Sequence, residues 1–101
     1  MNYTENFEGI KIDVQAVDID IDIALQKRIR EIIVSLRRHI SEVNWVDVYF
    51  KEEIQQSTNP RTFSIRFGIP GNDAFASDSG DNWLGLMKSV EDKLRRQLEK
   101  R

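Results

Sequence analysis

Hydrophobic and polar residues alternate in several short segments of the chain, and a period of two is typical of β-strands that are buried on one face. The alternation runs through residues 10–16, 43–52 and 63–67, and more briefly through 74–78. Each of these segments would turn an apolar face toward a core and a polar face toward solvent. The pattern therefore predicts four strands.

Two other segments place apolar residues three and four positions apart, as on one side of an α-helix. The first segment follows Asp20 and Asp22, and either carboxylate could cap the free amide groups of a helix. The second follows residues 79–82, which are expected to end the fourth strand and cap the helix. The apolar stripes are Leu25, Ile29, Ile32, Ile33, Leu36 and Ile40 in the first helix, and Trp83, Leu86, Met87, Val90, Leu94 and Leu98 in the second.

The order of these elements predicts an α+β fold, β-α-β-β-β-α. Three strands follow one another after the first helix, and short turns such as that at residues 70–72 favour antiparallel pairing. The apolar face of the sheet needs a cover, and the two helix stripes supply it. We therefore expect a four-stranded sheet with two helices packed on one face, formed by residues 9–101 as a single domain. Residues 1–8 are expected to be a disordered leader.

Composition limits the classes of protein that remain. The chain has 101 residues, of which 40% are hydrophobic, and this suits one domain with one core. It has no cysteine, which excludes disulfides and thiolate metal sites. The longest apolar runs, such as 32–34, have three residues, and residues 1–8 lack the features of a signal peptide. A cytoplasmic protein with no membrane partner is the expected result.

The net charge of −2 hides a strong segregation of charge along the chain. Residues 26–41 carry five basic residues and one acidic residue, and residues 88–101 carry six basic and three acidic residues. Both segments coincide with the predicted helices, whereas the rest of the chain is acidic. Such asymmetry suggests a patch for an anionic partner, although two ordinary solvated helix faces would give the same pattern.

Helical geometry distributes these basic residues over several faces at about 100° per residue. Lys27 and Arg38 point away from the first apolar stripe. Arg30 and Arg37 lie on one flank of that helix, with Arg28 and His39 on the other. On the second helix Lys93, Arg96 and Lys100 share one flank, and Lys88 and Arg95 share another. A groove between or across two such helices could seat phosphates.

Catalytic and metal-binding chemistry finds little support in the sequence. Asp18, Asp20 and Asp22 resemble the start of a calcium loop, but an EF-hand needs Gly at its sixth position and a carboxylate at its twelfth. Those positions hold Ile23 and Ile29. No phosphate-binding loop, nucleophile elbow or metal-ligand spacing occurs. We therefore expect no enzyme activity, no cofactor, no metal and no small-molecule substrate.

Three aromatic residues, Trp45, Tyr49 and Phe75, alternate onto the sheet face away from the helices. Exposed rings on a sheet can stack on the bases of single-stranded RNA, or they can form a surface for a protein partner. They can also serve as cross-strand pairs that stabilise the sheet, and this interpretation is favoured.

The chain resembles the ribosome hibernation promoting factor and ribosome-associated translation inhibitor family, also described as the sigma-54 modulation protein family. Residues 92–100, DKLRRQLEK, are similar to the family's closing "DKLxRQLxK" helix. Ala76-Ser77 with Gly80 resembles the end of its last strand, Ile21 with Ala24-Leu25 resembles its "ITxAL" motif, and residues 46–51 resemble its "VxVxLK" strand.

This resemblance covers residues 9–101 and implies a protein that binds the mRNA and tRNA channel of the small ribosomal subunit, on 16S rRNA. It implies translation inhibition and ribosome hibernation in stationary phase or under stress. Family members with a further dimerisation domain are longer, so the chain resembles the short type. The resemblance maps the family's basic positions onto Lys93, Arg96 and Lys100. The other candidate RNA contacts are Lys27, Arg28, Arg30, Lys88 and Arg95.

Overall fold

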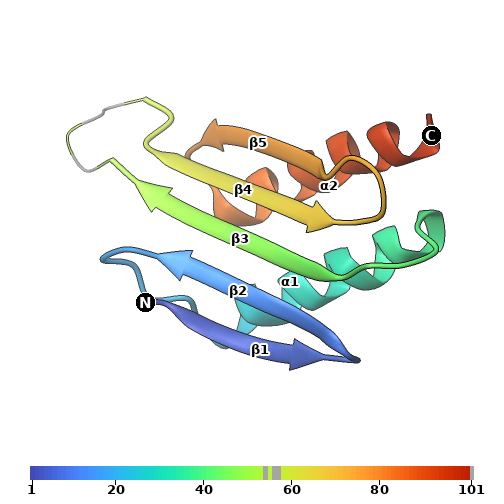
Figure 1. The fold of residues 1–101 in the computed structure, drawn as a ribbon. Helices are drawn as coiled ribbons and strands as arrows, with labels where there is room; N and C mark the ends of the chain where they lie inside the picture. Colours follow the sequence, from blue (N-terminus) through green and yellow to red (C-terminus); the bar gives the residue numbers. More distant parts are fainter. Residues whose placement is uncertain (54, 56–57, 101) are drawn as a thin grey trace.

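A computed structural model describes residues 1–53, 55 and 58–100 (Figure 1). It contains a five-stranded sheet and two long helices. The strands are β1 (Tyr3–Phe7), β2 (Ile10–Ala16), β3 (Trp45–Glu52), β4 (Arg61–Gly68) and β5 (Ala74–Gly80), and the helices are α1 (Ile23–Leu36) and α2 (Trp83–Glu99), with a short 3₁₀ turn, η1 (Arg37–His39), after α1.

The strands lie side by side in the order of the chain, from β1 to β5. The strands β3, β4 and β5 pair antiparallel, as predicted. The strand β2 runs parallel to β3, and α1 forms the crossover connection that such a pair requires. In Figure 1 the sheet lies in front of both helices, which cover the same face. The prediction of an α+β fold with both helices on one face is confirmed.

The prediction of four strands and a disordered leader is wrong at the N-terminus. Residues 3–7 form β1, which pairs antiparallel with β2 through a two-residue turn. Both turn residues, Glu8 and Gly9, have positive φ, 51° and 83°, as the tightest hairpin turns require. Tyr3 and Phe7 pack against the core, and this contact holds the strand on the domain.

Side-chain caps fix where the helices begin. The Asp22 carboxylate accepts a hydrogen bond from Leu25 N at 2.8 Å, and the Asn82 side chain accepts one from Gly85 N at 2.8 Å. Of the two predicted caps for the first helix, Asp22 is the one used. The helix α1 ends at Leu36, four residues before the predicted stripe ends, because the chain tightens into η1.

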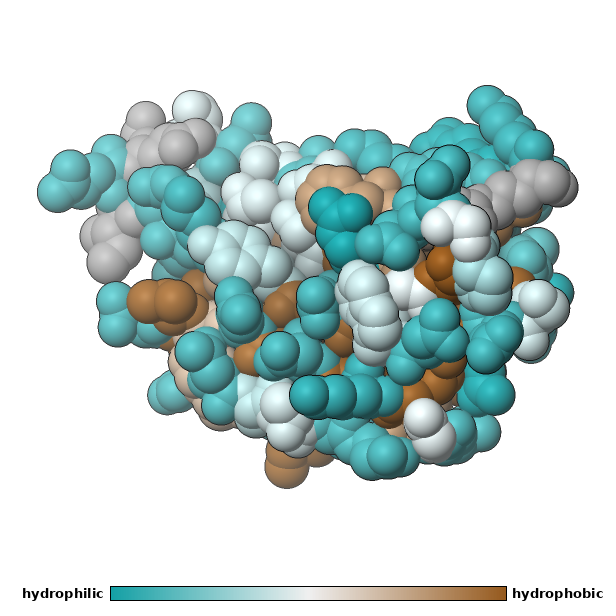
Figure 2. Space-filling view, viewed as in Figure 1, coloured by the Kyte–Doolittle hydropathy of each residue, from teal (hydrophilic) through white to brown (hydrophobic). Residues whose placement is uncertain are grey.

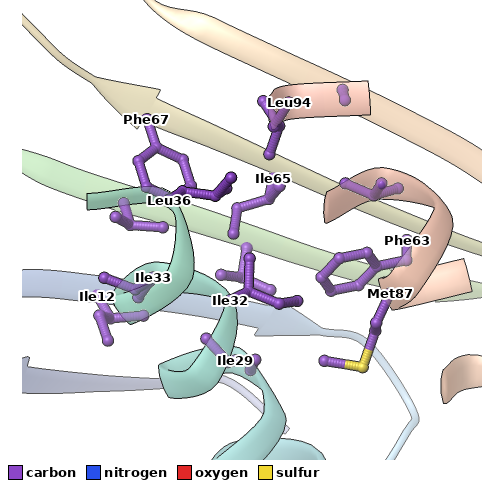
Figure 3. Close-up of a cluster of buried hydrophobic side chains, with 14 of the residues drawn as sticks. Ile12, Ile29, Ile32, Ile33, Leu36, Phe63, Ile65, Phe67, Met87 and Leu94 are labelled. Carbon is purple, nitrogen blue, oxygen red and sulfur yellow. The ribbon is translucent and has the colours of Figure 1, made fainter. Parts of the chain in front are cut away.

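The core fills the space between the sheet and the two helices (Figure 3). Ile32 and Leu36 of α1 and Leu94 of α2 are fully buried and meet the inner face of the sheet. Burying side chains of this size stabilises the fold by about 1.5–3 kcal/mol each. The predicted stripes are thus confirmed, and Trp83 packs against the same core. With its apolar sides buried, each helix exposes its charged sides at the surface.

Candidate nucleic-acid interface

A buried carboxylate joins the two basic helices. Glu91 of α2 is 4% exposed, and its Oε1 accepts a hydrogen bond from Arg28 Nη2 of α1 at 2.6 Å. Its Oε2 lies 3.3 Å from Arg95 Nη2, and Arg95 also donates to the Ser35 hydroxyl of α1. Two of the predicted RNA contacts, Arg28 and Arg95, are therefore already paired along the seam between the helices.

A second carboxylate neutralises charge on the same side of α2. Asp92 Oδ1 lies 3.2 Å from Lys88 Nζ and 2.8 Å from Arg95 Nη1. The hydrogen bond from Lys88, together with that from Arg95, holds the pKa of Asp92 below its usual range. Lys88 remains exposed, but its charge is balanced locally by Asp92.

On the opposite flank of α2, polar side chains reach the edge of the sheet. Lys93 Nζ donates to the backbone oxygen of Ser77 at 3.1 Å and lies 3.5 Å from the Asp78 carboxylate. Gln97 Nε2 donates to the backbone oxygen of Phe75 at 2.7 Å. These contacts satisfy carbonyl groups on the outer edge of β5 that have no neighbouring strand. Lys93 thus has a structural role in addition to any contact with RNA.

The outer flank of α1 is covered by acidic residues of the N-terminal hairpin. Arg30 makes two hydrogen bonds to the Glu5 carboxylate, from Nε at 2.5 Å and from Nη2 at 3.2 Å. The hydrogen bond to Glu5 raises the pKa of Arg30 further above its ordinary value. Arg37 Nη1 lies 3.4 Å from Glu8 Oε1. These pairs were not predicted, because residues 1–8 were expected to form a disordered leader.

Among residues 1–53, 55 and 58–100, four helix-associated cations are exposed and make no ion pair: Lys27, Arg38, Arg96 and Lys100. Lys27 and Arg38 lie on the outer side of α1 and its 3₁₀ extension, around the half-exposed Val34. Arg96 lies on the exposed side of α2, and Lys100 follows its last turn. Among the helix-associated residues that the structure describes, these are the positive charges that remain available to an external anion.

The face of the sheet away from the helices is mainly hydrophilic (Figure 2). Tyr49 and Phe75 are partly exposed there and line a hollow of about 130 Å³ with Asp47 and Arg66. The Arg66 guanidinium carbon lies 4.5 Å from the centre of the Phe75 ring, so this ring already has a cationic partner. Burial, and then the neighbouring charge of Asp13, raise the pKa of Asp47.

Trp45 also has a partner on this face, since its ring lies against Gly68 of β4. The three predicted aromatic residues occupy different cross-strand rows: Trp45 is paired with Gly68, Tyr49 with Ser64, and Phe75 with Arg66. Two of the three rings are thus engaged with the neighbouring strand. This arrangement favours cross-strand stabilisation over a continuous stacking platform.

The described part of the chain contains no helix that is long and apolar enough to cross a membrane. Within the same residues, no three His, Cys, Asp or Glu side chains come together as metal ligands.

The sequence profile of a family described as "Sigma 54 modulation protein / S30EA ribosomal protein" matches residues 12–101. The chain belongs to this family. The family membership that the motifs of the last helix and the strands indicated is therefore confirmed. The matched residues of this S30EA chain contain both helices and strands β3 to β5, together with most of β2.

Known proteins agree with this assignment. A ribosome hibernation promoting factor of Acinetobacter guillouiae is 26% identical over 97 residues, which cover 90% of this chain and 86% of the relative. The N-terminal domain of Thermus thermophilus Protein Y shares the S30EA fold, with a TM-score of 0.71 at 14% identity over 86% of this chain and 92% of that one. A ribosomal subunit interface protein from Coxiella burnetii has a TM-score of 0.69 at 19% identity, covering 88% and 93% of the two chains.

Proposed function

We propose that this S30EA protein binds the small ribosomal subunit in the mRNA and tRNA channel, on 16S rRNA, and thereby keeps ribosomes translationally idle. It acts by occupying the channel, in the cytoplasm, without catalysis or a cofactor. The observation that supports the proposal most directly is the set of unpaired cations on the helix side of the domain. Family membership supplies the ribosome as the partner.

The exposed cations suit the backbone of folded RNA. Arg38 and Arg96 can each grip a phosphate through two parallel N–H donors, whereas Lys27 and Lys100 offer point charges. Arg96 and Lys100 are four residues apart on α2, about 6 Å along the axis at 1.5 Å per residue. This spacing is close to that of successive phosphates along a nucleic-acid strand. The acidic residues elsewhere on the surface would repel RNA that approaches from other sides.

The remaining predicted contacts contribute differently in this proposal. Arg28, Arg95 and Lys88 are balanced by carboxylates of α2, so they shape the seam between the helices and add little net charge. Lys93 is exposed over 41% of its side chain and can reach an additional phosphate while it stays at the β5 edge.

The test is co-sedimentation of the full chain with purified bacterial small ribosomal subunits over a range of salt concentrations. A triple variant, K27A/R96A/K100A, removes three unpaired cations from the helix side. Each lost phosphate contact flattens the slope of log K against log salt by about 0.7–0.9, so the triple variant should flatten it by about two to three units. Stability should barely change, because exposed charges contribute little to it.

The matched control, K11A/K51A/R66A, removes three positive charges from the open sheet face. It should bind small subunits as the parent does. If this control loses binding while the helix variant keeps it, the sheet face is the RNA platform and the proposal is wrong. A parent protein that never sediments with small subunits would reject the proposal altogether.

A further inference from the structure

The N-terminal hairpin is an addition to the matched part of the fold. The family profile begins at residue 12, so β1, its turn and the start of β2 lie outside the match. The extra strand extends the sheet beyond β2, on the side where α1 lies. Glu5 of β1 and Glu8 of the turn reach Arg30 of α1 and Arg37 of η1, respectively.

The contact of Glu5 with Arg30 has the geometry of phosphate recognition. Both carboxylate oxygens of Glu5 accept hydrogen bonds from the guanidinium group, and the two side chains are 22% and 35% exposed. Arginine recognises phosphate by the same two-pronged arrangement. Glu5 therefore occupies the donors that Arg30 would otherwise offer to an RNA backbone.

The position of Glu5 is fixed by the fold. In the register of the hairpin Glu5 is opposite Ile12, which is buried under the helices, so Glu5 faces α1. Tyr3 and Phe7, on the same side of β1, pack against the core on either side of it. The chain start adds polar contacts, since the Asn2 side chain accepts a hydrogen bond from Ala16 N at 3.0 Å. A strand held in this way keeps its carboxylates on α1 in the folded protein.

We propose that the N-terminal hairpin is an acidic shield, formed by Glu5 and Glu8, which withholds Arg30 and Arg37 from RNA. The shield confines the RNA-binding surface to the unpaired cations of α1 and α2. It weakens binding to RNA backbone in general, because a phosphate that approaches this flank meets two carboxylates and two occupied arginines. The inference rests on the proposed function for its ligand, and it concerns a part of the surface that the unpaired cations do not occupy.

The shield is tested with the double variant E5Q/E8Q, which keeps the size of both side chains and removes their charge. Binding to purified small ribosomal subunits is measured against salt concentration. Two freed arginines should steepen the slope of log K against log salt by about 1.4–1.8 units. Affinity should rise about fivefold or more at low salt. An exposed charge pair contributes somewhat less than the 1.4 kcal/mol that corresponds to a tenfold change in affinity.

The matched control is E42Q/E53Q, which removes two exposed negative charges that pair with neither Arg30 nor Arg37. Both double variants change the net charge by the same amount, so a larger gain in affinity for E5Q/E8Q than for E42Q/E53Q is due to the position of Glu5 and Glu8. The variant E5Q/E8Q/R30Q/R37Q, which removes the charge of both members of each pair, should return to the affinity of the parent. Circular dichroism and urea unfolding of each variant confirm that the domain stays folded.

The outcomes distinguish the shield from the proposed function. If the parent binds small subunits and E5Q/E8Q binds no more tightly than E42Q/E53Q, the shield is refuted and the proposed function stands. Clearly weaker binding by E5Q/E8Q/R30Q/R37Q than by the parent would also refute the shield, since these arginines would then already contact RNA in the parent. If only E5Q/E8Q binds, the shield is confirmed and the proposed function fails for the parent. Absence of binding by every variant refutes both.

Discussion

The indole ring of Trp45 lies directly on the backbone of Gly68, its cross-strand partner in β4. A Cβ atom added at Gly68 would be 2.1 Å from Trp45 Cε2, and therefore inside the ring. The ring covers a strip of backbone on the otherwise hydrophilic sheet face. This contact explains both the glycine at the end of β4 and the partial burial of a tryptophan outside the core.

Replacing Gly68 by alanine should destabilise the domain by about 1–3 kcal/mol, because the indole must leave its place. In the double variant W45A/G68A the clash is gone, so the cost should fall well short of the sum of the two single variants. Urea unfolding of the three variants measures this coupling. Gly85→Ala is the control, since its Cβ would meet only Asn82 at 3.5 Å and alanine favours the helix. Additive effects of W45A and G68A would contradict the stacking.

Arg28→Ala should destabilise the domain by about 1–3 kcal/mol, because it removes a hydrogen-bonded partner from the buried carboxylate of Glu91. Arg95 remains as a partner, which keeps the cost below that of a fully isolated buried charge. The double variant R28A/E91A should recover part of the loss. Chemical denaturation is the measurement, with Lys27→Ala as a neighbouring control that should change stability by less than about 0.5 kcal/mol.

The variant K93A/Q97A should promote self-association through β5, since it leaves the carbonyl groups of Phe75 and Ser77 without side-chain donors. The expected result is a rise in apparent mass with concentration in light scattering. The control R96A/K100A also removes two polar side chains of α2, but these do not touch the edge of β5. Its apparent mass should therefore equal that of the parent. Equal behaviour of the two variants would show that the side chains of α2 do not protect the edge.

Acid should weaken the domain in part through Asp78. The hydrogen bond from the Ser89 hydroxyl, and then that from Ser79 N, lower the pKa of Asp78 below its ordinary value of 3.8. A carboxyl whose pKa is depressed by folding stabilises the protein above its unfolded pKa, and this contribution is lost as the pH falls through the folded pKa. Ser89→Ala should therefore cost stability at about pH 7, and this cost should shrink as the pH falls below 3.8 through the lowered pKa of Asp78.

The ionised carboxylate of Asp47 should have the opposite effect on stability and destabilise the folded domain. Burial raises its pKa, so the charged form is less favourable in the folded protein than in the unfolded chain. Asp47→Asn should consequently stabilise the domain at about pH 7 and have less effect at about pH 3, where both states are protonated. Urea titrations at the two pH values measure this difference alongside that of Ser89→Ala.

Most of the fold could be predicted because its elements have simple periodicities. The strands around Val14, Val48 and Ile65 alternate cleanly, and each helix has a continuous apolar stripe toward the sheet. The strand β1 escaped prediction because its inner positions are Tyr3, Glu5 and Phe7, with a charged residue at the centre. The available signal was the Glu8-Gly9 turn between aromatic and β-branched residues.

The site could be predicted only in outline. Helical spacing shows which basic residues are away from the core, but it does not show which of them meet an acid from another element. Arg28 pairs with Glu91, 63 positions away, and Arg30 with Glu5, 25 positions away in the other direction. Net charge counted along a helix therefore overestimates the charge that the surface presents.

The parallel pairing of β2 with β3 divides the sheet into two antiparallel ladders. One ladder, β3 to β5, is built from neighbouring segments joined by short connections, and its contacts are local in the chain. The other, β1 with β2, joins it only across a crossover of 28 residues, from Ala16 to Trp45. Closing such a loop costs more chain entropy than closing a hairpin. The pairing of the second strand with the third is thus the long-range contact of this sheet, and the first basic helix is part of the loop that this pairing closes.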